Sequence, residues 1–146
     1  MTQAHIGVIG VGTMGSALAL NFAEKGYDVA LWNLELEAVD RLIASAGDLA
    51  ARLQRCETLI DMVAALPVPR SIVLMIPAGA PVDKTIAALR PLLSPGDAII
   101  DGGNSDFRDT ISRTKGPEAA ARTYLGVGVS GCAAGARRGP SVSWWL

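Results

Sequence analysis

Ile6-Gly7-Val8-Ile9-Gly10-Val11-Gly12-Thr13-Met14-Gly15 is an apolar run followed by a glycine-rich turn. The run favours a buried strand, and apolar residues at every fourth position over 14–22 favour a helix directly after the turn. In a strand–turn–helix unit, the first glycine permits the tight turn, the second admits a pyrophosphate and the third allows close helix packing. Isolated glycine motifs also occur in simple turns. Here the flanking pattern predicts a dinucleotide site at the helix N-terminus, formed by Gly10, Val11, Gly12, Thr13, Met14 and Gly15.

The composition indicates an ordinary globular protein. The chain has 146 residues, half of them hydrophobic, with 13 basic and 14 acidic residues and a formal charge of −1. This balance offers no attraction to nucleic acid or to an anionic membrane surface. No apolar run reaches the roughly 18 residues of a membrane span, and the first residues do not resemble a signal peptide. We expect a cytoplasmic protein that binds neither nucleic acid nor membranes.

The two cysteines predict no metal or redox chemistry. Cys56 and Cys132 are far apart in the sequence and form no metal-ligand or disulfide-exchange spacing. Reduced thiols are the ordinary state in the cytoplasm. We therefore expect no metal site.

Strand-like and helix-like segments alternate along the rest of the chain. Apolar runs predict strands, and helical spacing predicts helices closed by Gly or Pro. The expected strands are 28–33, 71–76, 98–101 and 123–127, and the expected helices are 36–46, 57–66, 81–93 and an irregular helix over 106–121. Alternation of this kind predicts an α/β fold with a doubly wound, mostly parallel sheet of the Rossmann type. Glycine-rich segments at 10–15, 77–79, 102–105 and 128–132 would then meet at one sheet edge.

Asn33 is the candidate for contact with the adenosine ribose. It stands 18 residues after Gly15, close to where dinucleotide folds place the residue that meets this sugar. NAD sites usually have Asp or Glu there. The alternative is an asparagine that simply starts a turn at the strand end.

Three later segments resemble the N-terminal cofactor domain of the 6-phosphogluconate dehydrogenases. They are Ala78-Gly79-Ala80-Pro81-Val82-Asp83, Ile100-Asp101-Gly102-Gly103-Asn104-Ser105, and Gly128-Val129-Ser130-Gly131 followed by Gly135-Ala136-Arg137 and Gly139-Pro140-Ser141. The likeness runs from about residue 5 to 142. The β-hydroxyacid dehydrogenases share the first glycine motif and a Ser-Gly turn, but the Asp-Gly-Gly-Asn-Ser stretch favours the phosphogluconate branch.

The resemblance implies NADP as cofactor, a phosphorylated sugar acid as substrate, and oxidative decarboxylation of 6-phosphogluconate to ribulose 5-phosphate in the pentose phosphate pathway. Asn104 would lie between the nicotinamide and the sugar acid, although turn formation or helix capping would also explain Asn104 and Ser130. The other implied substrate contacts are Ser130, Gly131 and Cys132. The implied cofactor contacts beyond the glycine turn are Asn33, Leu34, Glu35, Ile76, Pro77, Ala78 and Asn104.

The sequence departs from the family where the 2′-phosphate of NADP would bind. Leu34 stands where the family has an arginine, and Pro77 stands where it has a lysine. A 2′-phosphate is normally held by an arginine through paired hydrogen bonds, which a leucine cannot make. Glu35 would repel the phosphate but would accept hydrogen bonds from a free ribose hydroxyl. NAD is therefore physically easier to bind than NADP.

Cys132 replaces the second glycine of the family's Ser-Gly-Gly turn. If this position requires a positive φ, its Cβ costs on the order of 1 kcal/mol. We expect a dinucleotide-binding domain over residues 1–142 and an atypical tail over 143–146. The adjacent Trp144 and Trp145 are typical of a truncated or frameshifted reading frame, or they fold back over a groove.

The family's helical C-terminal domain, which carries its catalytic lysine and glutamate, would follow the last residue of this chain. No catalytic residue is therefore assigned, and we expect no activity from the chain alone. Three alternatives stay open: a non-enzymatic NAD(P)-binding module, a non-functional remnant that folds poorly, and a β-hydroxyacid dehydrogenase-like domain that prefers NAD. The oligomeric state is also open.

Overall fold

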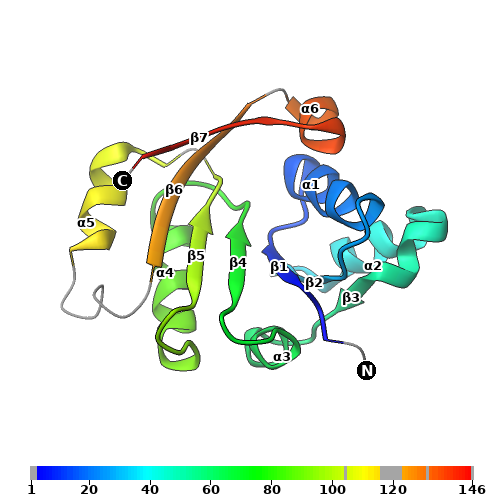
Figure 1. The fold of residues 1–146 in the computed structure, drawn as a ribbon, viewed down its shortest axis with the longest axis horizontal. Helices are drawn as coiled ribbons and strands as arrows, with labels where there is room; N and C mark the ends of the chain where they lie inside the picture. The colour runs from blue at the N-terminus through cyan, green and yellow to red at the C-terminus, as the bar shows by residue number, and fades with distance from the viewer. Residues whose placement is uncertain (1–2, 104, 116–122, 131, 146) are drawn as a thin grey trace.

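The computed structural model describes residues 3–103, 105–115, 123–130 and 132–145, and Figure 1 shows their arrangement. Strands and helices alternate over most of the chain, and short 3₁₀ turns cover Gly47–Arg52 and Arg90–Leu92. The elements are, in order, β1 (Ile6–Ile9), α1 (Thr13–Glu24), β2 (Val29–Trp32), α2 (Leu36–Ser45), β3 (Leu53–Arg55), α3 (Leu59–Ala65), β4 (Ser71–Leu74), α4 (Ala80–Leu89), β5 (Ala98–Asp101), α5 (Phe107–Thr114), β6 (Thr123–Ser130), α6 (Cys132–Arg138) and β7 (Ser141–Trp145).

The strands form a single sheet in the order β3-β2-β1-β4-β5-β6-β7. Strands β1 to β6 are parallel, and β7 pairs antiparallel with β6. The direction of winding reverses between β1 and β4, which is where doubly wound sheets bind ligands. The structure thus confirms the expected α/β fold with a doubly wound, mostly parallel sheet.

The strand register aligns the carboxyl ends of the central strands. Ile9 pairs with both Trp32 and Leu74, and Leu74 pairs with Asp101. The strand hydrogen bonding continues one residue further, because the N–H of Gly10 donates to the carbonyl of Trp32 at 3.0 Å and the N–H of Gly102 donates to the carbonyl of Leu74 at 2.8 Å. The turns after β1, β2, β4 and β5 therefore lie side by side.

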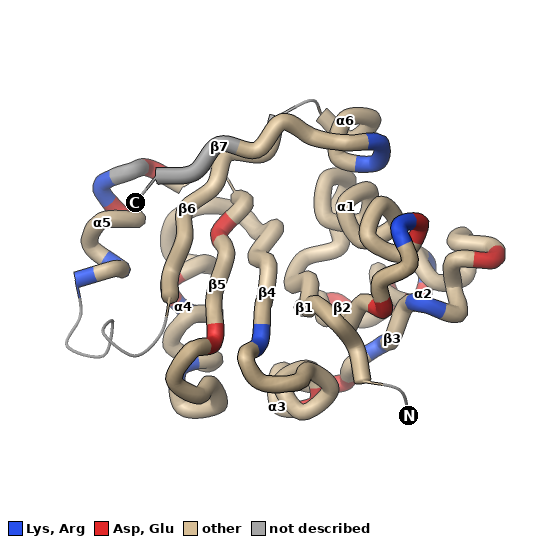
Figure 2. Tube along the Cα trace, in the orientation of Figure 1, with Lys and Arg blue, Asp and Glu red and all other residues tan. Residues whose placement is uncertain are grey.

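Two apolar cores lie on opposite faces of the sheet because successive strand side chains point to opposite faces. In β1, Val8 packs into the core beneath α1 and α2, whereas Ile9 packs into the core beneath α3 and α4. Figure 1 shows these helices flanking the sheet. Among the described residues, no helix is both long and apolar enough to cross a bilayer. Acidic and basic residues are interspersed along the chain in Figure 2.

Several elements differ from the sequence-based expectation. The three-residue strand β3, the helix α6 and the antiparallel strand β7 are not predicted by the sequence pattern. Strand β6 extends to Ser130, so residues 128–130 belong to a strand that pairs with β7 instead of a turn. Residues 141–145, at the junction of the expected domain and tail, form β7. Helix α5 covers the first part of the expected helix over 106–121, and residues 116–121 lie outside the described part of the chain.

At the amino ends of β4 and β5, a buried ion pair joins Arg70 to Asp97. The Asp97 side chain is fully buried, and its carboxylate accepts from the backbone N–H of Arg70 at 2.7 Å, from the Arg70 guanidinium at 2.9 Å and from the N–H of Ser94 at 2.8 Å. Burial alone would raise the pKa of Asp97, but these donors favour the charged form and together lower the pKa below its ordinary value.

We expect Asp97→Asn to lower the free energy of unfolding by about 3 kcal/mol at pH 7, because it leaves the guanidinium without its counter-ion. Because the pKa of Asp97 is lower in the folded state, its charge stabilises the fold at pH values above the unfolded-state pKa of about 4. This stabilisation is lost as the pH falls further, toward the pKa of the folded state. Urea unfolding at pH 7 and pH 3 should therefore show a smaller difference between wild type and variant at pH 3. The exposed Asp48→Asn is the matched control, with an expected change within about 0.5 kcal/mol. An equal difference at both pH values would contradict the role given to the Asp97 charge.

Candidate cofactor-binding site

The turn after β1 has room only for glycine at two of its positions. Gly10 has a φ of +95°, and a Cβ on it would lie 2.4 Å from the carbonyl oxygen of Met75. A Cβ on Gly15 would lie 1.8 Å from the carbonyl oxygen of Gly10. Helix α1 therefore lies directly against the turn. At Gly12 a Cβ would meet nothing within 4 Å, so the backbone there faces open space.

The N-terminus of α1 is suited to an anion. Gly12 is the N-cap residue, and no acidic residue lies in the first turn of this fully described helix. The first N–H groups of a helix lack partners within the helix, and the helix dipole places partial positive charge there. Ser16 closes the turn from inside, since its hydroxyl donates to the carbonyl of Val11 at 2.7 Å. A pyrophosphate above Gly12 would meet these N–H groups directly.

Asn33 links the end of β2 to the glycine turn. Its side-chain oxygen accepts from the N–H of Val11 at 3.1 Å, and its amide nitrogen donates to the carbonyl of Glu35 at 3.0 Å. One amide N–H and one lone pair are left over, because an asparagine side chain has two donors and two acceptor positions. Asn33 therefore starts a turn and also keeps polar capacity toward a ligand at the strand end.

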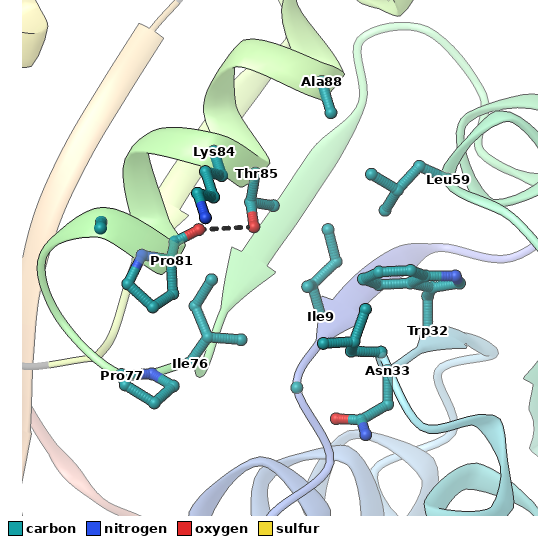
Figure 3. A pocket seen from close by; sticks show the side chains of 13 residues that line it. Ile9, Trp32, Asn33, Leu59, Ile76, Pro77, Pro81, Lys84, Thr85 and Ala88 are labelled. Atoms are coloured by element: carbon teal, nitrogen blue, oxygen red, sulfur yellow. Dashed lines mark hydrogen bonds between the residues drawn. The ribbon is translucent and has the colours of Figure 1, made fainter.

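A cavity of about 600 Å³ opens beside this turn, between the ends of β1 and β2 on one side and α4 on the other. Figure 3 shows Trp32, Asn33 and Leu59 on one wall, facing Pro77, Pro81 and Thr85 on the other. Its size is typical of small-molecule sites. The lining is predominantly apolar, and Lys84 is its charged side chain. The lining residues predicted from the sequence are Gly10, Asn33, Leu34, Ile76 and Pro77.

Other lining residues have only a weak signal in the sequence. Pro81, Lys84, Thr85 and Ala88 are spaced at i, i+3, i+4 and i+7, so they share one face of α4 beside its core face of Val82, Ile86 and Leu89. This spacing identifies a second helix face, but not the cavity that it lines. Trp32 and Leu59 come from β2 and α3, and only the folded sheet brings them together. Lys84 is exposed, as expected for a surface charge, and lies at the rim of the cavity.

The β2 side of the cavity is poor in positive charge. Leu34 is 86% exposed at the edge of the cavity, and its apolar side chain supplies no positive charge there. Glu35 is the exposed N-cap residue of α2, and Glu37 follows in the first turn of that helix. Lys84 approaches from the opposite wall.

The turn after β5 is organised around a buried carboxylate. Asp101 is fully buried and accepts from the N–H of Gly103 at 3.0 Å, from the Ser105 hydroxyl and from the Tyr124 hydroxyl at 2.8 Å. Burial, together with hydrogen bonding to the Asp101 carboxylate, raises the pKa of Tyr124. Tyr124 therefore stays protonated and donates at neutral pH.

The predicted substrate residues lie mostly at the limits of the described structure. Asn104 and Gly131 lie outside the described residues, and Ser130 is the last residue of β6. Cys132 is exposed at the start of α6 and has a φ of +50°, the left-handed conformation that glycine tolerates best. Ala78 is exposed in the turn before α4. Among the described residues, no three His, Cys, Asp or Glu side chains are grouped so that they could hold a metal ion.

The sheet order, the glycine turn and the adjoining cavity define a Rossmann-type dinucleotide-binding domain. Residues 5–143 match the family model described as the NAD binding domain of 6-phosphogluconate dehydrogenase. The chain therefore belongs to the 6-phosphogluconate dehydrogenase family, through the NAD(P)-binding domain of these enzymes.

Individual members of the family are similar to this chain over most of its length. The chain is 46% identical over 137 residues to a decarboxylating 6-phosphogluconate dehydrogenase of Bacillus licheniformis, and the match covers 94% of this chain. It is 47% identical, also over 137 residues, to an NAD⁺-dependent 6-phosphogluconate dehydrogenase of Bacillus subtilis. A Plasmodium falciparum 6-phosphogluconate dehydrogenase, solved in its apo form and with NADP⁺ or 6-phosphogluconate, superposes with a TM-score of 0.89 at 34% identity and covers 96% of this chain.

The match is confined to one part of these proteins. This chain spans 29% of the length of the two Bacillus relatives and 30% of the Plasmodium chain. A 3-hydroxyisobutyrate dehydrogenase of Mycobacterium tuberculosis shares the fold with a TM-score of 0.77 at 21% identity. The Rossmann-type architecture is therefore shared more widely than the family motifs.

We expect Cys132→Gly to raise the free energy of unfolding by about 1 kcal/mol, because glycine adopts the positive φ at this position without the Cβ penalty. In a domain of this size the melting temperature should rise by about 2–4 °C. Cys132→Ala is the matched control, since it removes the thiol but keeps the Cβ, and its melting temperature should stay close to that of the wild type. If alanine stabilised the protein as much as glycine, the thiol and not the backbone would be responsible.

Proposed function

We propose that this chain is the cofactor-binding unit of a 6-phosphogluconate dehydrogenase-type oxidoreductase and that it prefers NAD to NADP. The pyrophosphate would lie over Gly12 at the N-terminus of α1, and the adenosine would enter the cavity between β2 and α4. The observation that carries the proposal is the geometry of the turn after β1. Gly10 and Gly15 hold α1 against the turn, the backbone at Gly12 is open, and the cavity begins at Gly10 itself.

The cavity supports binding of the adenine ring. Trp32, Leu59 and Ile76 give it apolar walls, and Asn33 supplies amide groups at its mouth. A ligand site of this kind combines a largely apolar lining with a few fixed polar groups. The fixed group here is Asn33, because its bond to Val11 ties the adenosine end to the pyrophosphate turn.

Charge at the β2 end favours NAD. A phosphate held by an arginine gains charge-assisted hydrogen bonds worth about 1.5–3 kcal/mol each, and Leu34 makes none. Glu35 and Glu37 add negative charge on the same side, where a free ribose 2′-hydroxyl is tolerated better than a phosphate. The Bacillus subtilis relative, which is named as NAD⁺-dependent, is consistent with this preference. Lys84 on the opposite wall is the competing positive group.

We expect NAD⁺ to bind at least tenfold more tightly than NADP⁺ in calorimetric titrations of the purified chain. Leu34→Arg should raise the affinity for NADP⁺ at least tenfold and change that for NAD⁺ less than about threefold, because one charge-assisted contact accounts for this difference. Leu34→Gln is the matched control, since it adds a polar side chain without charge and should leave the preference unchanged. Tighter binding of NADP⁺ by the wild type would contradict the argument and would indicate Lys84 or Arg41 as the phosphate-binding group.

We propose further that this chain alone binds cofactor without turning over 6-phosphogluconate. General acid–base catalysis requires a titratable group within hydrogen-bond reach of the proton that moves. His5 precedes the amino end of β1, at the opposite edge of the sheet from the cavity, and Lys115 follows the last turn of α5. Near the turn after β5, the Asp101 carboxylate is already hydrogen-bonded and Tyr124 is held protonated.

We therefore expect no increase in absorbance at 340 nm when the purified chain is mixed with 6-phosphogluconate and either NAD⁺ or NADP⁺. Cofactor binding measured on the same preparation shows that the protein is folded and competent. Turnover that disappears with Gly12→Asp, a change that places negative charge under the pyrophosphate, would show that the chain is an enzyme by itself.

A further inference from the structure

Arg113 of α5 contacts both the turn that follows β4 and the end of β5. Its side chain is only 7% exposed, and its guanidinium contacts groups from three different elements. Nε donates to Asp83 at 2.7 Å and Nη2 donates to the carbonyl of Gly79 at 3.4 Å. Both contacts fall on the N-terminal turn of α4.

The same guanidinium also faces the turn after β5. Nη1 lies 3.6 Å from a carboxylate oxygen of Asp101 and 3.5 Å from the Tyr124 hydroxyl, which itself donates to that carboxylate. Burial alone would lower the pKa of Arg113, but the Asp83 and Tyr124 partners raise it, so the charge is fixed. Arg113 is therefore ion-paired with the fully buried Asp101 as well as with the nearer Asp83.

Asp101 in turn holds the backbone of the turn that carries Gly103 and Ser105. It accepts from the N–H of Gly103 and from the Ser105 hydroxyl, so the direction of its carboxylate positions these two residues. Helix α4 is held by packing instead of by a carboxylate, because Val82 and Leu89 are fully buried in the core. Arg113 thus connects a turn that depends on one carboxylate to a helix that is fixed by packing.

A dinucleotide crosses a doubly wound sheet at the point where the strand order reverses, with one nucleotide on each side. The adenosine side is the β2 side, as the cavity and Asn33 indicate. The nicotinamide side is then the side of β4 and β5, where the turn held by Asp101 lies. Arg113 does not line the adenosine cavity.

We propose that Arg113 is a positioning residue for the nicotinamide half of the cofactor, acting through Asp101 on the turn after β5. This role rests on the proposed function. The planar guanidinium has five donors in a fixed fork and contacts both turns at once, whereas a lysine ammonium is a compact point charge that cannot span them.

The test compares the affinities for NAD⁺ and ADP, measured by calorimetry. ADP carries the adenosine and pyrophosphate, and NAD⁺ adds the nicotinamide riboside. Arg113→Lys should weaken NAD⁺ binding at least fivefold and change ADP binding less than twofold. Arg108→Lys, an exposed substitution on the same helix, should change neither affinity.

A role limited to stability would lower both affinities in parallel or leave both unchanged, and either result would overturn the proposal. If Arg113→Lys does not fold, Tyr124→Phe replaces it as the test, because it removes the hydroxyl between Arg113 and Asp101 at almost constant volume. It should weaken NAD⁺ binding selectively by at least twofold, and an unchanged ratio of the two affinities would again overturn the proposal. If the wild type bound neither ligand, the proposed function would fail, and the positioning role would fail with it.

Discussion

The carboxyl edge of the sheet depends on the close approach of α1 to the end of β1. The missing side chain of Gly15 places the helix against the carbonyl of Gly10, and the positive φ of Gly10 turns the chain toward the helix at the contact with Met75. Because β1 lies between β2 and β4, this contact determines where the neighbouring turns meet. A larger residue at either glycine would push the N-terminus of α1 away from the cavity beside it.

Electrostatics divides the two sides of this edge. On the β2 side the charged groups are exposed, so solvent and salt screen them and they contribute little to the stability of the fold. On the β5 side the charges of Asp101 and Arg113 are buried. Asp101 accepts hydrogen bonds from the turn and from Tyr124, and Arg113 donates to Asp83 and lies 3.6 Å from Asp101. Buried networks of this kind hold a single geometry because any unpaired member is costly. The carboxyl edge of the sheet therefore has exposed, screened charges at its β2 side and a buried, fixed charge network at its β5 side.

The sequence was sufficient to predict the sheet class, the glycine turn and the family, because each depends on local patterns. Strand β3 was missed because Leu53 is the single apolar residue among its three. Helix α6 contains a glycine and two arginines without an apolar stripe, so no period identifies it. Strand β7 and the bond from Val11 to Asn33 depend on contacts between residues distant in the sequence. The cavity-lining face of α4 is visible as a helical spacing, but only the folded sheet gives it an opposite wall.

The two hydrogen bonds of Asn33 limit which side chain can replace it. In many dinucleotide folds an acidic residue at the end of β2 selects the cofactor. Here an aspartate would keep the acceptor for Val11, but it would bring an oxygen against the carbonyl of Glu35, to which the asparagine now donates. An aspartate at position 33 would therefore lose the bond to Glu35 and place two acceptor oxygens against each other. The side chains at positions 34 and 35 are exposed, so a substitution there leaves the hydrogen bonds of Asn33 and the turn after β1 in place.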